Sequence, residues 1–282
     1  MTNTLLRTAP DLSAAPDVET RKPRRPIFAN VVTSEWTKMR TVPSTVWSLL
    51  TTIAITVGLG SLLSWAYVSR YDRLTLQERL TFDPTAHSLS GLFLAQIAIG
   101  VLGVLIITSE YTTGLIRPTF TATPQRRVVL AAKATAFGII AFVISAVATL
   151  IAFVVGQSIL ASKHLGVSLT DPGVARALFG ASAYLVFIGL LGLALGTIVR
   201  RTAGAIAALF GLVLVLPLLA LALPSPWSTD TSKLLPGQAG QALFAVHHTT
   251  DLLTPTLGAI VCLIWLAATF TIAIVLISRR DA

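Results

Sequence analysis

The chain has 282 residues, of which 54% are hydrophobic and 12% are charged, whereas about a quarter of the residues are charged in ordinary soluble domains. This composition excludes a water-soluble protein and indicates a membrane protein. The formal net charge is +9 at pH 7. The single cysteine, Cys262, rules out an intrachain disulfide and a cysteine-based metal cluster.

Six intervals of the chain carry no Asp, Glu, Lys or Arg, and each exceeds the roughly 20 residues that a helix needs to cross a bilayer. The apolar runs are continuous rather than alternating, which favours helices over a β-barrel. We therefore predict an all-α polytopic membrane protein with a single transmembrane domain over 27–282. The six transmembrane helices are expected at about 45–67, 89–108, 128–160, 177–199, 203–223 and 255–278.

The first 26 residues hold four prolines, scattered acids and a run of bases, so 1–26 is predicted to be a disordered cytoplasmic tail. The bases suit a solvated flank, and binding to anionic lipid heads is the alternative. The next stretch, 27–40, has the amphipathic pattern of a helix lying in the interface, with Trp36 at headgroup level. Glu35 falls within the apolar arc of this helix. It therefore needs a partner such as Lys38 or a base on another segment, unless it snorkels to the interface.

The stretch 109–133 separates the second span from the third and combines one acid, four bases, Gly114 and two prolines with apolar side chains. It is too short to be a domain and too mixed in character to lie in lipid, so we predict a cytoplasmic element that contacts a partner. Thr123 and Pro124 are expected to open the third span. Glu110 is expected to pair with an arginine of the stretch, the candidates being Arg117, Arg126 and Arg127. The side chains expected to face the partner are Tyr111, Leu115 and Phe120.

Polar chemistry inside the predicted spans is sparse. Gln96 and Gln157 are the candidates for a transport pathway, with an interhelical hydrogen bond as the alternative for each. No ionisable side chain lies deep in a span, which disfavours a proton- or ion-coupled carrier. Two adjacent histidines, His247 and His248, point apart in a helix or strand, so no metal site is predicted there.

Glycine and proline mark special positions in three spans. Gly100 and Gly103 allow close helix approach in the second span, and Gly192-x-x-x-Gly196 provides a small-residue face in the fourth. These faces are expected to meet a second permease. Pro217 is expected to kink the fifth span.

Orientation follows from the basic residues. With the amino terminus inside, the inner segments hold 15 Lys and Arg against 6 Asp and Glu, whereas the outer loops hold 6 of each sign. The positive-inside tendency therefore places both termini in the cytoplasm. The basic charge needs no nucleic acid to explain it.

Two segments resemble permease subunits of the ABC-2 (type V exporter-like) group of ATP-binding-cassette transporters, in the form common in actinobacteria. The first is SEWTKMRT at 34–41; the second is TSEYTTGLIR at 108–117, continuing to PQRR at 124–127 and AAK at 131–133. The resemblance implies that the first is an elbow helix and the second a coupling helix that docks on a nucleotide-binding subunit. It also implies re-entrant helices on the outer side, in 224–255. Pro118 departs from a plain coupling helix and is expected to break or bend it.

The resemblance extends to individual positions. It assigns ATPase docking to Glu110, Tyr111, Gly114, Leu115, Ile116, Arg117, Phe120, Arg126 and Arg127. It assigns the elbow helix to Glu35, Trp36, Lys38 and Arg40.

The function that the resemblance implies is a multi-pass permease of the bacterial plasma membrane that exports a hydrophobic or amphipathic compound. The sequence has no G-x-x-x-x-G-K-[ST] phosphate loop, so the chain is not expected to be an enzyme. A separate ATPase would bind ATP and Mg, and a second permease copy or a related permease would complete the channel. Membrane lipid is the remaining partner, and no metal, cofactor or nucleic acid is expected in this chain. The alternative is a non-transporting membrane anchor or sensor that holds a cytoplasmic partner.

Overall fold

The computed structural model describes residues 28–122, 125–220, 222, 224, 227–246 and 252–279. Every regular element in these residues is helical, and six stretches are long and apolar enough to cross a membrane. The predicted fold class, an all-α multi-pass membrane protein with six spans, is confirmed. The spans are α2 (Pro43–Arg70), α5 (Leu92–Thr112), α7 (Arg126–Leu160), α8 (Val174–Val199), the stretch from α9 (Thr202–Phe210) to α10 (Leu216–Ala220), and α13 (Pro255–Arg279).

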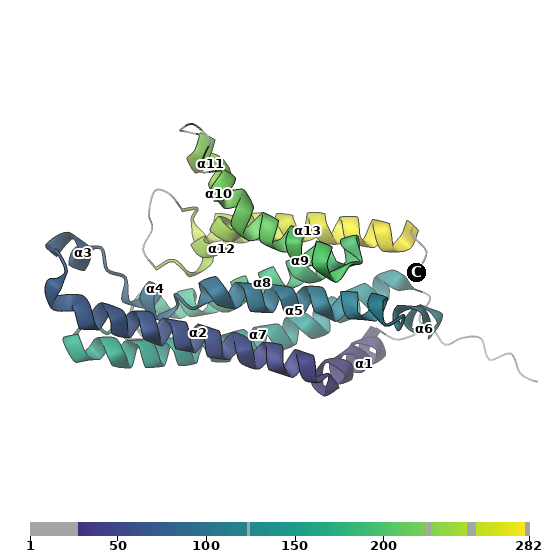
Figure 1. Ribbon diagram of the computed structural model, residues 1–282, viewed down its shortest axis with the longest axis horizontal. Coiled ribbons are helices and arrows are strands. Elements are labelled where there is room, and N and C mark those ends of the chain that lie inside the picture. Colours follow the sequence, from purple (N-terminus) through teal and green to yellow (C-terminus); the bar gives the residue numbers. More distant parts are fainter. Residues whose placement is uncertain are drawn as a thin grey trace, which may run out of the picture.

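Shorter helices gather at the two ends of the bundle. At one end lie α1 (Phe28–Thr41) and α6 (Ile116–Ala122), and α6 packs against the last turn of α13 (Figure 1). The opposite end carries α3 (Leu76–Leu80) and α4 (Pro84–Ser88), which follow a 3₁₀ turn, Tyr71–Arg73. The remaining short helices are α11 (Trp227–Lys233), α12 (Pro236–Phe244) and the 3₁₀ turn Ala161–Lys163.

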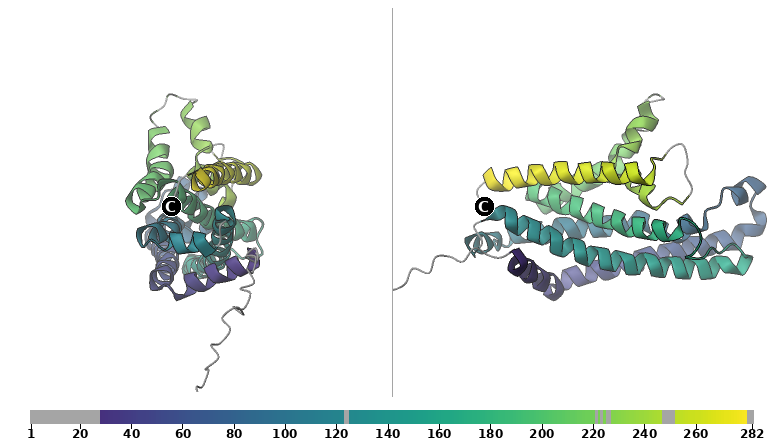
Figure 2. Two further views of the ribbon diagram at one scale, coloured as in Figure 1. Left: turned by 90° about the vertical axis from the view of Figure 1, so that its right-hand side faces the viewer. Right: turned by 180° about the vertical axis from the view of Figure 1, so that it is seen from behind.

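Helix α8 is the centre of the bundle and packs against α5, α7, α12 and α13 (Figure 2). Its contact with α5 is a close approach of two backbones. A Cβ atom on Gly103 would lie 2.0 Å from the carbonyl oxygen of Gly189, and one on Gly192 would lie 2.2 Å from that of Gly100. The glycine faces that the sequence suggested for a second permease are therefore buried within this chain, since only glycine lets the helices come this near.

The fifth span is irregular because of Pro217. The turn Gly211–Val215 is a π-helix, in which the N–H of Leu216 bonds to the carbonyl of Gly211. Proline has no N–H for the carbonyl four residues before it, Val213, and its ring clashes with that carbonyl. A widened turn relieves the clash. The predicted kink is therefore present as this π turn, after which α10 leads away from the bundle and α11 leads back to α12 (Figure 1).

On the side of α3 and α4, α12 packs tightly between α8 and α13. A Cβ atom on Gly240 would lie 2.1 Å from the ring of Tyr184, so the two helices touch at this glycine. Arg176 donates to the carbonyls of Leu243 at 3.1 Å and Ala245 at 2.6 Å. The guanidinium thus satisfies carbonyls at the carboxyl end of α12 that have no partner within the helix.

Three sequence-based expectations fall outside the described residues: the tail 1–26, the Thr123–Pro124 pair and the histidines His247 and His248. Helix α7 begins at Arg126, and Gln125 occupies its cap position. The second span runs from Leu92 to Thr112, so it starts and ends later than predicted.

Candidate functional site

Four charged side chains form a closed ring where α1, α5 and α7 meet, and we call Glu35, Lys38, Glu110 and Lys133 the charge ring. Lys133 donates to Oε2 of Glu35 and, at 2.8 Å, to Oε1 of Glu110. Lys38 donates to Oε1 of Glu35 at 2.7 Å and lies 3.4 Å from Oε1 of Glu110. Acid and base alternate around the ring, so its formal charge is zero.

The ring is buried except at Lys38. Glu35, Glu110 and Lys133 are each less than one-tenth exposed, whereas the side chain of Lys38 is 44% exposed. Lys133 lies seven residues into α7, about 10 Å along the helix axis. A charge at that depth is costly unless it is paired, and two carboxylates from different helices pair with it.

The surroundings of Glu35 act on its pKa in opposite directions. Burial alone raises the pKa of this carboxyl, but the charges and hydrogen bonds of Lys133 and Lys38 outweigh burial and hold it below its usual range. Burial also disfavours the charged form of Lys38, which for a lysine lowers the pKa. Its hydrogen bond to Glu35 and the charge of Glu110 outweigh that effect and raise the value. Both groups are thus held in their charged forms near neutral pH.

These contacts settle two expectations about pairing. Glu35 needed either Lys38 or a base on another segment, and it has both, because Lys133 reaches it from α7. The snorkelling alternative is wrong, since Glu35 is 1% exposed. Glu110 was expected to pair with an arginine, and the ion pairs found for it are with Lys133 and Lys38.

The arginines of the stretch have other roles. Arg126 donates to the carbonyl of Ile277 at 3.0 Å and covers the ring of Phe120, which ties the start of α7 to the end of α13. Arg127 Nε lies 3.5 Å from the hydroxyl of Ser278. Arg117 belongs to α6, and its side chain is outside the described residues.

A left-handed turn at Gly114, where φ is +73°, connects α5 to α6. Glycine adopts this conformation without strain, so the chain changes direction here. Leu115 follows directly and is 58% exposed. Pro118 does not break α6, because it falls in the first turn, where the N–H that proline lacks has no helical partner.

Two apolar residues of α6 face inward. Ile116 and Phe120 pack against Ile107 of α5, Val129 of α7 and Ile277 of α13. Tyr111 is half-buried beside this cluster, with the guanidinium of Arg200 over its ring. Three residues were expected to face a partner, and of these Leu115 is exposed. Tyr111 and Phe120 pack inward and hold the stretch against the bundle instead.

A groove of about 550 Å³ opens beside the charge ring. We call it the α1–α5 groove. Its apolar wall includes Met39, Leu102, Leu105 and Ile106. All four members of the charge ring line its polar end. Trp36 and Arg40 lie on another face of α1, where Trp36 is half-buried and Arg40 is exposed.

The two glutamines proposed for a pathway are engaged in helix packing. Gln96 accepts a hydrogen bond from the hydroxyl of Tyr184 and donates to the carbonyl of Phe93 at 2.9 Å. Gln157 donates to the carbonyl of Pro84 at 3.1 Å and to Ser88 at 3.0 Å. It also accepts from the N–H of Val167 at 2.8 Å. These bonds match the interhelical alternative stated for both residues.

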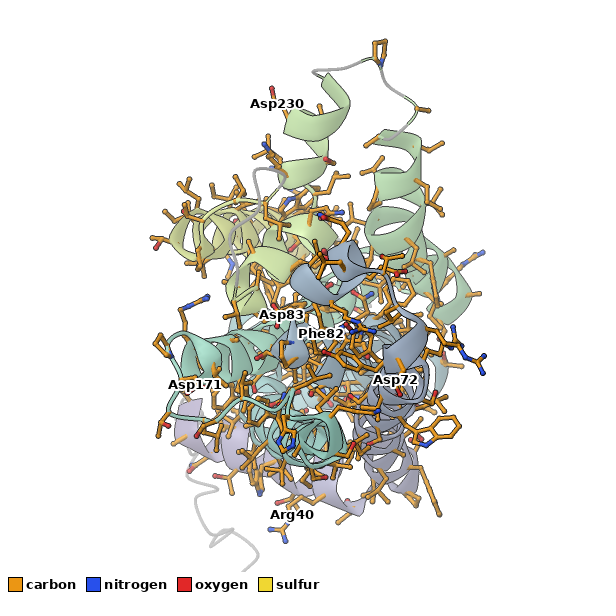
Figure 3. All side chains as sticks on the ribbon, turned by 90° about the vertical axis from the view of Figure 1, so that its left-hand side faces the viewer. Arg40, Asp72, Phe82, Asp83, Asp171 and Asp230 are labelled. Atoms are coloured by element: carbon orange, nitrogen blue, oxygen red, sulfur yellow. The ribbon has the colours of Figure 1, made fainter. Side chains whose placement is uncertain are left out.

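Among the described residues, no group of three His, Cys, Asp or Glu side chains is placed to hold a metal ion. At the end that carries α3 and α4, Asp72, Asp83, Asp171 and Asp230 lie apart from one another (Figure 3). Asp83 caps α4, and Asp72 pairs with Lys163 at 2.8 Å. Asp72 and Asp83 therefore have structural partners of their own.

Lys133 is the member of the ring that sequence reasoning did not assign a role. It bounded an apolar interval and so resembled an ordinary flanking charge. The sequence does carry one signal: the residues before it, Val128–Ala132, are apolar as well, so Lys133 lies within an apolar run.

A scan against protein-family models finds no match to this chain, and a search of curated proteins finds none either.

Proposed function

We propose that this protein is the permease subunit of an ATP-binding-cassette exporter and that a separate ATPase docks on α6. The supporting observation is that α6 joins two membrane spans through a sharp turn and presents one large apolar side chain, Leu115, at that turn. An apolar side chain can anchor an interface when a pocket of the partner buries it. The resemblance of 108–117 to a coupling segment supports the same role.

The packing beneath α6 suits the transmission of movement. Ile116 and Phe120 fix α6 to α5, α7 and α13 at once, so a force on α6 acts on three spans. The charge ring then links α5 and α7 to α1. A partner that shifts α6 would therefore tilt spans together rather than bend one loop.

The remaining parts of the proposal rest on the sequence. Without a phosphate loop, the chain relies on its partner for ATP and Mg binding and for hydrolysis. The excess of basic residues on the α1 and α6 side supports a cytoplasmic location for that side in a bacterial cell. A second copy or a related permease completes the pathway for a hydrophobic or amphipathic compound.

The test is co-purification. The tagged chain is extracted from its own host in mild detergent, and the proteins that accompany it are identified by mass spectrometry. The wild type should bring down an ATPase with a phosphate loop, and Leu115→Asp should reduce its recovery about 30-fold, since a buried apolar anchor is worth about 2 kcal/mol or more.

Leu76→Asp is the matched control. Leu76 is 72% exposed on α3, at the opposite end of the bundle, so its replacement should leave recovery unchanged. Full recovery of the ATPase with Leu115→Asp would refute docking at this turn. Recovery of a kinase or a maturation factor in place of an ATPase would support an anchor or sensor instead.

A further inference from the structure

The α1–α5 groove combines an apolar wall with an uncommon polar end. Leu102, Leu105 and Ile106 belong to the last half of α5, and from Leu102 to Ser109 the wall extends about 10 Å along the helix. The groove therefore runs from the end of the membrane span into its apolar part. Its volume, about 550 Å³, is typical of a site for a small ligand.

Two features of the polar end indicate a ligand with both charges. The Oε2 atom of Glu110 is buried without a hydrogen-bond partner, although Oε1 has two lysine neighbours. A buried carboxyl oxygen without a partner calls for a donor, and the groove lies beside Glu110. Lys38, by contrast, is 44% exposed at the same groove and retains a proton to donate.

The start of α2 adds to the positive side of the site. Ser44 and Thr45 of its first turn line the groove, and no side chain caps this 28-residue helix at Val42. Helix N-termini attract anions, and phosphate above all. Lys38 and the first turn of α2 thus suit a phosphate group, while Glu110 suits an ammonium group.

We propose that the α1–α5 groove binds a membrane phospholipid whose zwitterionic headgroup carries a primary ammonium. The phosphate lies against Lys38 and the start of α2, the ammonium donates to Oε2 of Glu110, and one acyl chain lies along Leu102, Leu105 and Ile106. A zwitterion fits better than a net anion because the charge ring is already neutral. The proposal requires the six-span membrane protein and does not depend on transport or on an ATPase.

The choline headgroup provides the discriminating comparison. It carries the same phosphate and the same net charge, but its quaternary ammonium has no hydrogen to donate to Glu110. Two phospholipid probes with the same photoreactive acyl chain, one with an ethanolamine and one with a choline headgroup, are placed in vesicles with the full chain. After illumination, labelled peptides are mapped by mass spectrometry.

The ethanolamine probe should label 102–106 about tenfold more than the choline probe, as expected for one charge-assisted hydrogen bond. Glu110→Gln should bring the two probes to the same level. Leu105→Trp, which fills the groove and leaves the charge ring intact, should remove labelling by both probes. Val143→Trp, in a separate apolar groove beside α2, is the control and should change neither.

Equal labelling of 102–106 by the two probes in the wild type would overturn the proposal. So would a headgroup preference that survives Glu110→Gln. Stronger labelling by an otherwise identical glycerol-headgroup probe would show an anionic lipid site instead. If Glu110→Gln does not insert, Leu105→Trp still decides whether the groove is the site.

Discussion

The ammonium of Lys133 lies 2.8 Å from the carboxylate of Glu110, and both side chains are buried where the third span begins beside the end of the second. Because Lys133 also pairs with Glu35, one lysine holds α1, α5 and α7 together. The junction is electrically neutral only when all four members of the charge ring are present. Removal of any one leaves a net charge in a buried place.

Replacement of Lys133 by methionine tests the energetic importance of the ring. Met fills a similar volume but leaves two buried carboxylates with Lys38 as their remaining ring partner. Breaking a buried pair in this way costs about 3–5 kcal/mol. We expect a large fall in the thermal unfolding midpoint of the purified protein, as measured by circular dichroism in detergent.

Lys163→Met is the matched control for Lys133→Met. Lys163 pairs with Asp72 at 2.8 Å on the protein surface, where an ion pair contributes about 0–1 kcal/mol. Its midpoint should stay close to that of the wild type. Adding Glu35→Gln to Lys133→Met should recover part of the lost stability. Equal falls in the midpoint for Lys133→Met and Lys163→Met would show that the buried ring contributes no more than a surface ion pair.

Stability should depend on pH in a direction set by Glu35. Its pKa is lowered from 4.5, so the stability it contributes is complete above pH 4.5 and is lost as pH falls through the lower folded value. In Glu35→Gln this acid-side loss should be smaller, as measured by unfolding midpoints across acid pH. A dominant transition near neutral pH that persists in the variant would point to another group.

Lys38 sets the corresponding limit at alkaline pH. Its pKa is raised from 10.5, so its contribution is complete below pH 10.5 and is lost as pH rises through the higher folded value. Lys38→Gln should therefore show a weaker alkaline dependence than the wild type in the same unfolding assay. An unchanged alkaline limb would exclude Lys38 as its source.

The spans were predictable because each is a continuous apolar run, and a bilayer imposes the length. Their ends were less predictable. Helix α5 continues through Glu110 because Lys133, 23 residues away, neutralises it, and no local pattern shows that pairing. The site was visible in part, since Glu35 stood out as an acid on an apolar arc.

The orientation of α6 was beyond the sequence pattern. The left-handed turn at Gly114 resets the direction of the chain, so the phase of α5 does not carry over into α6. Periodicity alone therefore did not decide which of Leu115, Ile116 and Phe120 points outward. Packing against α5, α7 and α13 decides it, and those contacts are distant in sequence.

The predicted orientation is tested by single cysteines in a background with the buried Cys262 changed to alanine. Gln77 and Ser168 are exposed at the end that carries α3 and α4, and Thr113 is exposed beside α6. An impermeant thiol reagent should label cysteines at 77 and 168 in intact cells, and cysteine at 113 after the cells are opened. Labelling at 113 alone in intact cells would invert the topology.

The contact between α5 and α8 should tolerate no added methyl group at Gly103. In Gly103→Ala the new Cβ would lie 2.0 Å from the carbonyl oxygen of Gly189, and a backbone atom cannot swing aside as a flexible side chain can. The central pair of helices must separate, with a loss of packing that typically costs about 1–3 kcal/mol. We expect a lower unfolding midpoint for the monomer in detergent. Gly58→Ala is the control, because nothing lies within 4 Å of a Cβ atom there, and alanine favours the helix. The opposite outcome would be an unchanged unfolding midpoint of the monomer together with weaker self-association. In that case the glycine face serves a second subunit, and the close α5–α8 contact is not what holds the chain together.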